Sequence, residues 1–588
     1  MTQDNVEKQP PVPPFVRFVA SAVPMVFDNS LSYYEAICAM WKYLSDTVNV
    51  INNNATVTEE YIQLTKDMKE YMDNYFDNLD VQEEINTKLD AMVEDGTLQE
   101  IITTYIQSNV AWTFDTVADM KSATNLIAGS YARTLGFYSL NDGGGAFYYI
   151  SDTGTANEKD VIAVDTLYAN LILEPVMTPN QFGALGDGLT DDSSYIQYAL
   201  AHCPYIKLFS SVYLAKNIEM GNYNTLDGNG KTLKIADNTK LLTNNYNNAT
   251  VQHNITIKNL VVDCDDVVGS DEQNNLIYLC GVDNCLIDGV IIDGSKSDGI
   301  YIGTYNFAKT NTNVRITNCK ISNSGRNNIS VIAGEVLIDN CQFDGGTVSS
   351  IDVEPNIDSD HSDVTIRDCI ITNGFINGYV KTSLIDTKAN ININNCRISS
   401  SVISVYLQYM NNVIVDNNVI SSSSTSNYGV VTLYTNAHNI VRGNIVNSTT
   451  SIAGIRVSAG NNSDIVNNVI NTAKYGLEII DSSRCLIEGN KINNSATMGI
   501  YNRGTTTRNN YSFNTIVNGG NYISTNGSSY ELICGNICSS DNAGTTRGIQ
   551  LASDTSKCLV VNNIVTDATQ YAIRDSGTNN TQDNNITS

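Results

Sequence analysis

Short strand-like segments recur along the last two-thirds of the chain, and this repetition constrains the fold more than any other feature. One set of copies reads VRITNCKI (314–321), VLIDNCQF (336–343), VTIRDCII (364–371), ININNCRI (391–398), VIVDNNVI (413–420), SDIVNNVI (463–470), CLIEGNKI (485–492) and CLVVNNIV (558–565). A second set reads SDGIYI (297–302), NNISVI (327–332), SSIDVE (349–354), AGIRVS (453–458), YGLEII (475–480), MGIYNR (498–503) and RGIQLA (547–552). Successive copies mostly fall 22 to 29 residues apart.

This repeat predicts a mainly β chain in which residues 176–588 form a parallel β-solenoid, with one coil per repeat. Parallel strands stack about 4.8 Å apart, so equivalent side chains of successive coils lie in columns. We expect Ile and Val to fill the interior. At the turns between faces we expect stacked Asn side chains that bond to their copies one coil away, and buried thiols; these residues are Asn417, Asn467, Asn490, Cys319, Cys341, Cys369 and Cys396.

Net charge excludes several classes of partner. The chain carries a formal charge of −28 and only 16% charged residues. Such a field repels nucleic acids and anionic membranes, and an anionic substrate would need local Lys, Arg or a metal ion. The 13 cysteines include no CxxC pair beside a second CxxC or an HxxxH, which disfavours a zinc site. We interpret the cysteines as thiols of a protein made in a reducing cytosol.

The first 175 residues differ from the repeats. Residues 1–30 are Pro-rich and expected to be extended, either as an anchor that orders against a partner or as a plain linker. Residues 31–108 space apolar side chains by three and four, which predicts helices. These helices form either a trimeric coiled-coil stem, which we favour, or an intramolecular hairpin. Residues 109–175 place aromatic strands around the turn DGGG and predict a small β connector domain.

Neither a secretion signal nor a membrane span is predicted. The opening MTQDNVEKQPPVPPF has no basic region followed by an apolar run, and no stretch of about 18 apolar residues occurs. A protein that works outside cells without such a signal can leave by lysis, inside a virion.

The segment VMTPNQFGALGDGLTDDSSYIQYAL (176–200) resembles the opening of the pectate-lyase superfamily of right-handed parallel β-helices, with its FGAxGDGxTDD motif. The resemblance implies a tight acidic turn followed by a helix that closes the N-terminal end of the solenoid. Asp191 and Asp192 fall at the start of that helix, where carboxylates are favoured. We interpret this segment as structural.

Upstream segments narrow the resemblance. FDNSLSYYEAICAMWKYLSDTVNVINN (27–53), NLDVQEEINTKLDAMVEDGTLQEII (78–102) and TLGFYSLNDGGGAFYYI (134–150) resemble the virion-attachment and connector regions of tail-spike and appendage proteins from phages of Gram-positive hosts. This implies a homotrimer in the virion, made in the host cytoplasm, that binds phage tail or connector proteins through residues 1–108. Family members bind wall teichoic acid, capsule or other surface glycans, and some degrade them. A C-terminal chaperone that some relatives cleave off is either removed or lacking here.

A candidate catalytic pair lies in SSIDVEPNIDSDHSD (349–363). With Ile351 and Val353 inward, Asp352 and Glu354 point outward with Cα atoms roughly 6.5 Å apart. This suits an inverting glycosidase, whose carboxyl groups lie about 6.5–9.5 Å apart, better than a retaining one at about 5–5.5 Å. The ordinary alternative is a pair of solvated surface acids.

Further candidates surround this pair. The register places Tyr301, Ser330 and Asp352 in one column, with Arg326 and Asn327 one coil before Asp352. Arg326 is suited to a sugar hydroxyl, a phosphate or a carboxylate. The predicted substrate-binding residues are Asp298, Tyr301, Arg326, Asn327, Arg456 and Glu478. Equivalent outward positions and nearby rings add possible groove residues, namely Tyr501, Gln550, Tyr406, Tyr409, Tyr428, Tyr434 and Tyr475.

No cofactor is required by this chemistry. A divalent cation such as Ca²⁺ is an alternative for the acidic segment, without a recognisable loop spacing; its ligands would be Asp352, Glu354, Asp358, Asp360 and Asp363. The NTD, DD, GHG and RIK motifs of polygalacturonases are absent as a set, which disfavours pectin chemistry. Three functions stay open: a depolymerase, a non-catalytic adhesin, and a cellular polysaccharide lyase or epimerase.

Overall fold

In the computed structural model the described residues are 66–67, 82–98, 101 and 111–588, without 248–249, 266, 268–270, 305–310, 357–359, 382–387, 424–427, 437, 449–451 and 542–546. Residues 1–172 and 173–588 form two compact units. Of the predicted stem, only helix α4 (Gln82–Glu94) and a few neighbouring residues lie within the described ranges, and the stem stays a prediction. Most of the stem and all of residues 1–30 lie outside the described residues. No helix in the described ranges is both long and apolar enough to cross a membrane.

The first unit contains the expected small β domain. Its sheet has the order β1-β2-β3-β5-β4, from β1 (Ala111–Phe114), β2 (Tyr131–Thr134), β3 (Phe147–Ser151), β4 (Val161–Val164) and β5 (Leu167–Leu171), with helix α6 (Val117–Lys121) beside it. Asp142 organises the Gly-rich turn before β3. Its carboxylate accepts hydrogen bonds from the backbone N–H groups of Phe137, Tyr138, Ser139 and Gly144.

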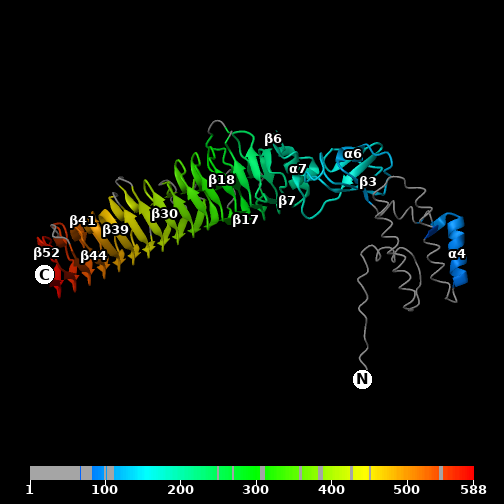
Figure 1. Ribbon diagram of the computed structural model, residues 1–588. Helices are drawn as coiled ribbons and strands as arrows, with labels where there is room; N and C mark the ends of the chain where they lie inside the picture. The colour runs from blue at the N-terminus through cyan, green and yellow to red at the C-terminus, as the bar shows by residue number, and fades with distance from the viewer. Residues whose placement is uncertain are drawn as a thin grey trace, which may run out of the picture. The chain divides into compact units, whose positions relative to one another are not determined.

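The second unit is a right-handed parallel β-solenoid of about 18 turns, as the repeat and the resemblance predicted. Figure 1 shows its coils stacked one after another from β7 to β52. Each regular coil contributes one strand to each of three faces. The first face comprises β7 (Tyr205–Lys207), β10 (Thr225–Asp227), β13 (Gln252–His253), β14 (Thr256–Lys258), β17 (Val282–Asp288), β20 (Thr312–Thr317), β23 (Gly334–Asp339), β26 (His361–Arg367), β29 (Lys388–Asn394), β32 (Asn412–Asp416), β35 (Asn439–Arg442), β38 (Asp464–Val466), β40 (Leu486–Glu488), β43 (Asn510–Ser512), β47 (Leu532–Cys534), β50 (Leu559–Val561) and β53 (Thr581–Asp583).

The other two faces belong to one continuous sheet. The second face comprises β6 (Asp187–Asp191), β8 (Val212–Ala215), β11 (Thr232–Ile235), β15 (Val261–Asp263), β18 (Ile291–Asp293), β21 (Lys320–Ser322), β24 (Gln342–Asp344), β27 (Ile370–Thr372), β30 (Arg397–Ser400), β33 (Val419–Ser422), β36 (Ile445–Ser448), β44 (Thr515–Val517), β48 (Ile537–Ser539), β51 (Ile564–Val565) and β54 (Ile586–Thr587). The third face comprises β9 (Ile218–Met220), β12 (Leu242–Asn244), β16 (Ile277–Cys280), β19 (Ile300–Gly303), β22 (Asn327–Val331), β25 (Ser349–Val353), β28 (Ile376–Tyr379), β31 (Val405–Gln408), β34 (Gly429–Tyr434), β37 (Ala453–Ser458), β45 (Asn521–Thr525), β49 (Arg547–Leu551) and β52 (Tyr571–Asp575). The long strands β39 (Val469–Ile480) and β41 (Lys491–Arg503) run through both faces, and β42 (Thr506–Thr507) pairs with β46 (Ser528–Ser529).

The motif FGALGDG forms the acidic turn that the resemblance implied. The carboxylate of Asp192 is fully buried and accepts hydrogen bonds from the backbone N–H groups of Leu185 (2.8 Å) and Gly186 (2.9 Å). Asp191 accepts one from the N–H of Ser193, the first residue of helix α7 (Ser193–His202). The preceding short helix η1 spans Pro179–Phe182. Because α7 packs on β7 and β9, it covers the first strands of the solenoid.

Turns between the first and second faces carry a ladder of Asn side chains, which are buried except for the half-buried last member, Asn585. The backbone N–H and the Nδ2 of Asn468 both donate to Oδ1 of Asn490, and Asn490 donates in the same way to Asn514. Each Nδ2 also donates to a backbone carbonyl of the preceding coil. The ladder residues are Asn418, Asn444, Asn468, Asn490, Asn514, Asn536, Asn563 and Asn585. Its place is taken earlier in the chain by the predicted buried cysteines, Cys319, Cys341, Cys369 and Cys396.

The sequence prediction was right for Asn490 and wrong by one residue for Asn417 and Asn467. These two residues have φ of 55° and 56°, and their backbone makes the left-handed turn just before the ladder position. Asn tolerates that conformation better than other residues with a Cβ, because its short side chain hydrogen-bonds locally. Two adjacent Asn residues therefore serve two different purposes, and the repeat pattern alone did not separate them.

Candidate functional site

One column of polar and aromatic side chains runs along the third face. The strand register places Tyr301 beside Ser330 and Ser330 beside Asp352, as predicted. Side chains alternate along a strand, so Ile351 and Val353 fill the core and Asp352 lies on the outer side. We call this array the polar column; its members are Tyr278, Tyr301, Ser330, Asp352, Asn377, Tyr406, Thr432, Arg456, Glu478, Tyr501, Ser524, Gln550 and Arg574.

Asp352 is buried by its neighbours in the column, although it points away from the core. Only 5% of the residue's surface is exposed to solvent. One carboxylate oxygen accepts a hydrogen bond from Nδ2 of Asn377 (2.7 Å), and the other accepts one from Nδ2 of Asn327 (3.4 Å). Burial raises the pKa of Asp352 to about 6, against the lowering effect of the bond from Asn377. Asn377 was not predicted as a site residue; its only sequence signal is its register beside Asp352.

Asp298 belongs to the same hydrogen-bonded group. Its carboxylate accepts hydrogen bonds from the backbone N–H of Asn327 (3.0 Å) and from Oγ of Ser330 (2.9 Å). Nδ2 of Asn327 donates to Oγ of Ser330 (3.0 Å). Burial raises the pKa of Asp298, while the nearby Arg326 guanidinium opposes that shift. Asp298 and Asn327 have no exposed surface. Their predicted part in ligand binding would therefore be indirect, through the side chains with which they interact.

Three of the predicted residues reach the surface around this buried group. The Arg326 guanidinium is 3.9 Å from Asp298 and 3.9 Å from Glu272, and its side chain is 30% exposed. The Tyr301 ring is partly exposed and stacks on Tyr278 with centroids 4.8 Å apart. Glu354 follows the end of β25, and its side chain is partly exposed. The structure therefore brings Asp352, Arg326 and Tyr301 to one place, with Glu354 at its margin.

Arg456 and Glu478 lie four and five coils beyond Asp352 and bind each other. Both Nε and Nη2 of Arg456 lie 2.6 Å from one carboxylate oxygen of Glu478, and Nε of Arg503 lies 3.0 Å from the other. The side chains of Arg456 and Glu478 are 13% and 1% exposed. Their direct contact with a ligand stays a prediction. Arg503 was missed because it lies outside the polar column, at the end of β41.

Four of the predicted tyrosines, Tyr406, Tyr409, Tyr428 and Tyr434, gather on the two coils after Asn377. The ring of Tyr406 lies against Tyr428 with centroids 5.4 Å apart. The ring of Tyr409 lies between those of Tyr379 and Tyr434, at 6.2 Å and 5.7 Å. Because Tyr428 and Tyr434 are 43% and 41% exposed, this part of the third face presents aromatic surface to solvent.

The Ca²⁺ alternative stays a prediction. Among the described residues, no group of three or more His, Cys, Asp or Glu side chains is arranged to hold a metal ion. Asp358, one of the five suggested ligands, lies outside the described residues. Asp360 is buried and accepts hydrogen bonds from the backbone N–H of Asn356 (2.8 Å) and from Thr304 (3.3 Å).

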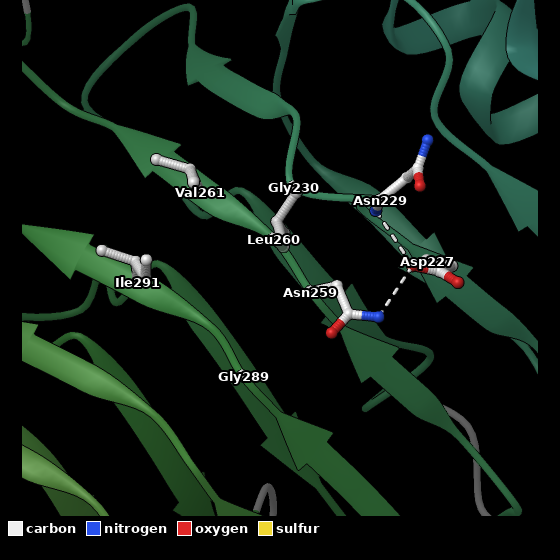
Figure 2. Close-up of a pocket in the computed structure, with 8 residues that line it drawn as sticks. All are labelled: Asp227, Asn229, Gly230, Asn259, Leu260, Val261, Gly289 and Ile291. Carbon is white, nitrogen blue, oxygen red and sulfur yellow. Dashed lines mark hydrogen bonds between the residues drawn. The ribbon is translucent and has the colours of Figure 1, made fainter.

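Two hollows lie away from the polar column. One of them, of about 350 Å³, lies beside Asp227 near the start of the solenoid. Figure 2 shows the residues that line it. The Asp227 carboxylate accepts hydrogen bonds from Tyr205, from the backbone N–H of Asn229 and from Asn259. Both of its oxygens therefore make hydrogen bonds that stabilise the fold. The other, of about 500 Å³, is lined only by Ser and Asn residues of β30, β33, β36, β39 and nearby turns.

A model of the family described as "Periplasmic copper-binding protein (NosD)" matches residues 353–537. No curated protein matches the chain. Among solved structures, tailspike protein 3 of bacteriophage CBA120 is 18% identical, with a TM-score of 0.44 over 72% of this chain and 64% of that one. Tailspike protein gp49 of the Acinetobacter baumannii bacteriophage Fri1, a capsular polysaccharide depolymerase, is 13% identical, with a TM-score of 0.41 over 81% and 75%. The A-module of the Azotobacter vinelandii mannuronan C-5 epimerase AlgE4 is 14% identical, with a TM-score of 0.41 over 65% and 99%.

The chain thus spans a little less than two-thirds of the length of the CBA120 tailspike.

Proposed function

We propose that this chain is a spike or appendage of a bacteriophage tail whose β-solenoid attaches the virion to a polysaccharide on the host cell surface. The observation that carries the proposal is the polar column. Stacked coils place one outward side chain about every 4.8 Å along a straight line, which suits an extended polymer. Tyr rings offer apolar faces for sugar rings to stack on, while Asn, Arg and carboxylate groups hydrogen-bond hydroxyls.

The finer features of the proposal come from the resemblance of the N-terminal segments. They are a homotrimeric assembly, attachment to tail or connector proteins through residues 1–108, and wall teichoic acid or capsule as the polymer. Synthesis in the host cytoplasm belongs to the same proposal, as does the residence of the finished protein in the virion.

Removing the partly exposed side chains around Asp352 should weaken attachment. We expect the triple substitution Tyr301→Ala, Arg326→Ala and Asn377→Ala to weaken binding of the full chain to host cell walls at least tenfold, since each lost contact contributes on the order of 1 kcal/mol. Sedimentation of labelled protein with walls measures this. The control carries Arg315→Ala and Tyr530→Ala, two exposed side chains on or beside the first face, and should bind as the parent does. Equal binding by parent and triple variant would place attachment elsewhere.

Hydrolysis is the second candidate, and the raised pKa of Asp352 favours it. In an inverting reaction protonated Asp352 would give its proton to the glycosidic oxygen while Glu354 takes one from the attacking water. Attachment ranks above cleavage because Asp352 is only 5% exposed, which restricts access of a glycosidic oxygen.

If Asp352 is the general acid, release of reducing ends should fall as pH rises through about 6 and should be lost in Asp352→Asn, with binding retained. A reducing-end assay on host polysaccharide across pH 4.5–8 measures this. Unchanged cleavage by Asp352→Asn and by Glu354→Gln would exclude this pair. If the parent chain binds the polysaccharide but does not cleave it, the remaining function is that of a non-catalytic adhesin.

A further inference from the structure

One outward column of the second face is apolar along most of the solenoid. Strand register joins its members from β15 to β54 without a break. We call this column the apolar stripe; its members are Val261, Ile291, Lys320, Gln342, Ile370, Arg397, Val419, Ile445, Val469, Lys491, Thr515, Ile537, Ile564 and Ile586. Nine of the fourteen are Val or Ile, and seven of these nine are between 36% and 62% exposed.

The other two faces do not present such a stripe. Among the exposed large hydrophobic residues that the structure describes, the first-face strands contain only Leu559 and the third-face strands only Tyr434. Outward apolar residues of the first face, such as Ile414 and Leu486, are only partly exposed. Monomeric proteins rarely expose large continuous apolar surfaces, so the stripe indicates a surface that another molecule covers.

Charge also distinguishes the second face. From β33 to β54 its strands contain one charged residue, Lys491, and the bends toward the third face add Lys474, Asp541 and Asp567, so that the sum is zero. Copies of a chain with a formal charge of −28 repel each other in general, and this repulsion is weak on an uncharged face. The first-face strands of the same coils contain five charged residues, namely Asp416, Arg442, Asp464, Glu488 and Asp583.

The spacing of the apolar stripe identifies its partner. The members follow one another at the coil spacing of about 4.8 Å, which makes a line about 60 Å long. A surface that matches the stripe over this length needs the same spacing, and a second copy of the chain, parallel and at the same height, has it. A band one strand wide, or about 10 Å, gives about 600 Å² on each copy. The total of about 1,200 Å² reaches the lower end of the range for stable interfaces.

We propose that copies of this chain pack through the second face, parallel and in register, with their apolar stripes facing one another. This rests on the homotrimeric assembly proposed above and names the surface that holds the copies together. The three faces of a coil point in different directions, so packing through the second face leaves the third face of every copy exposed. The polar column of each copy is then complete within one chain.

Disulfide cross-linking of three matched cysteine variants of the full chain tests the proposal. Ile445→Cys changes the apolar stripe, Leu559→Cys the first face and Tyr434→Cys the third face; the parent side chains are 42%, 40% and 41% exposed. Copper–phenanthroline catalyses oxidation of neighbouring thiols by oxygen, and a non-reducing gel measures the fraction of linked chains. Among the described native cysteines all but Cys534 are buried, and the parent chain measures their background.

We expect Ile445→Cys to place at least half of the chains in disulfide-linked pairs, because equivalent residues of parallel copies meet at the same height. The yield should stay constant over about a hundredfold dilution, which separates assembly from collision. Leu559→Cys and Tyr434→Cys should stay at the background of the parent. Adding Val419→Glu to Ile445→Cys should lower the yield at least fivefold, since equal charges then face each other, whereas adding Ile414→Glu should not. Circular dichroism confirms that each variant folds.

The outcomes separate this inference from the proposed assembly and from attachment. Light scattering gives the number of chains in the parent, each of 64.1 kDa. A trimer that cross-links through Leu559→Cys or Tyr434→Cys as well as through Ile445→Cys, or through none of the three, overturns the second face as the contact and leaves the trimer standing. A monomeric parent that binds host cell walls overturns both and leaves attachment standing.

Discussion

Replacing Asn490 by alanine should lower the free energy of unfolding of the solenoid by roughly 3–6 kcal/mol. The substitution removes the acceptor for two donors of Asn468 and the donor to the carbonyl of Ile465. Asn490 is fully buried, so water does not replace these partners. Each buried group left unpaired costs about 1–3 kcal/mol. Denaturant unfolding of parent and variant, followed by circular dichroism, measures the difference.

The neighbouring substitution Asn467→Gly provides the control. Asn467 is exposed with φ of 56°, and Gly443 and Gly489 occupy the same position on the adjacent coils. Because Gly adopts positive φ without strain, this variant should unfold within about 1 kcal/mol of the parent. A loss for Asn490→Ala no greater than for Asn467→Gly would mean that the ladder contributes little to stability.

Replacing Glu531 by glutamine should stabilise the chain at neutral pH by about 3 kcal/mol. Glu531 is 1% exposed and lies inside the solenoid, where it accepts hydrogen bonds from the backbone of Asn509 (2.9 Å) and from Thr506 (3.3 Å). Burial raises its pKa from 4.5 to about 8. Glutamine fills the same space and keeps an oxygen for the Asn509 N–H without a charge.

The gain should depend on pH in a defined direction. Below pH 4.5 the carboxyl is protonated in both the folded and the unfolded chain, so the substitution changes little. Between pH 4.5 and 8 the folded chain retains a proton that the unfolded chain has released, so the parent loses stability as pH rises. Above about 8 the difference stays constant.

Thermal midpoints of parent and Glu531→Gln at several pH values between 4 and 8.5 measure this dependence. The control Glu488→Gln removes the same charge from an outward position on β40 and should show no such rise between pH 4.5 and 8. A constant difference at all pH values would mean that Glu531 is not protonated in the folded chain at neutral pH.

Much of the fold follows from local pattern. Each repeat contains alternating Ile and Val residues, and a parallel solenoid is the arrangement that buries these residues in every repeat. Aligning the repeats also gives the register that places Ser330 beside Asp352. The turn at Asp192 and helix α7 follow from a motif within a dozen residues.

The sequence predicted most residues of the candidate site but missed Asn377 and Arg503, and it did not predict which side chains are buried. Strand alternation placed Asp352 on the outer side, yet its exposure depends on Asn377 and Asn327 from adjacent coils, 25 residues away in either direction. Likewise the pairing of Glu478 with Arg456 and Arg503 joins three coils. Adjacent Asn residues such as Asn467 and Asn468 differ in role only through their backbone angles.

The sequence by itself determined the repeat, the parallel solenoid and the order of side chains in the polar column, because each depends on a period that a linear pattern contains. Only the tertiary structure decided which of those side chains are buried, which donors pair, and which apolar side chains of the second face stay exposed. Those properties arise between coils, since burial and electrostatic potential depend on distances in space that spacing along the chain does not specify.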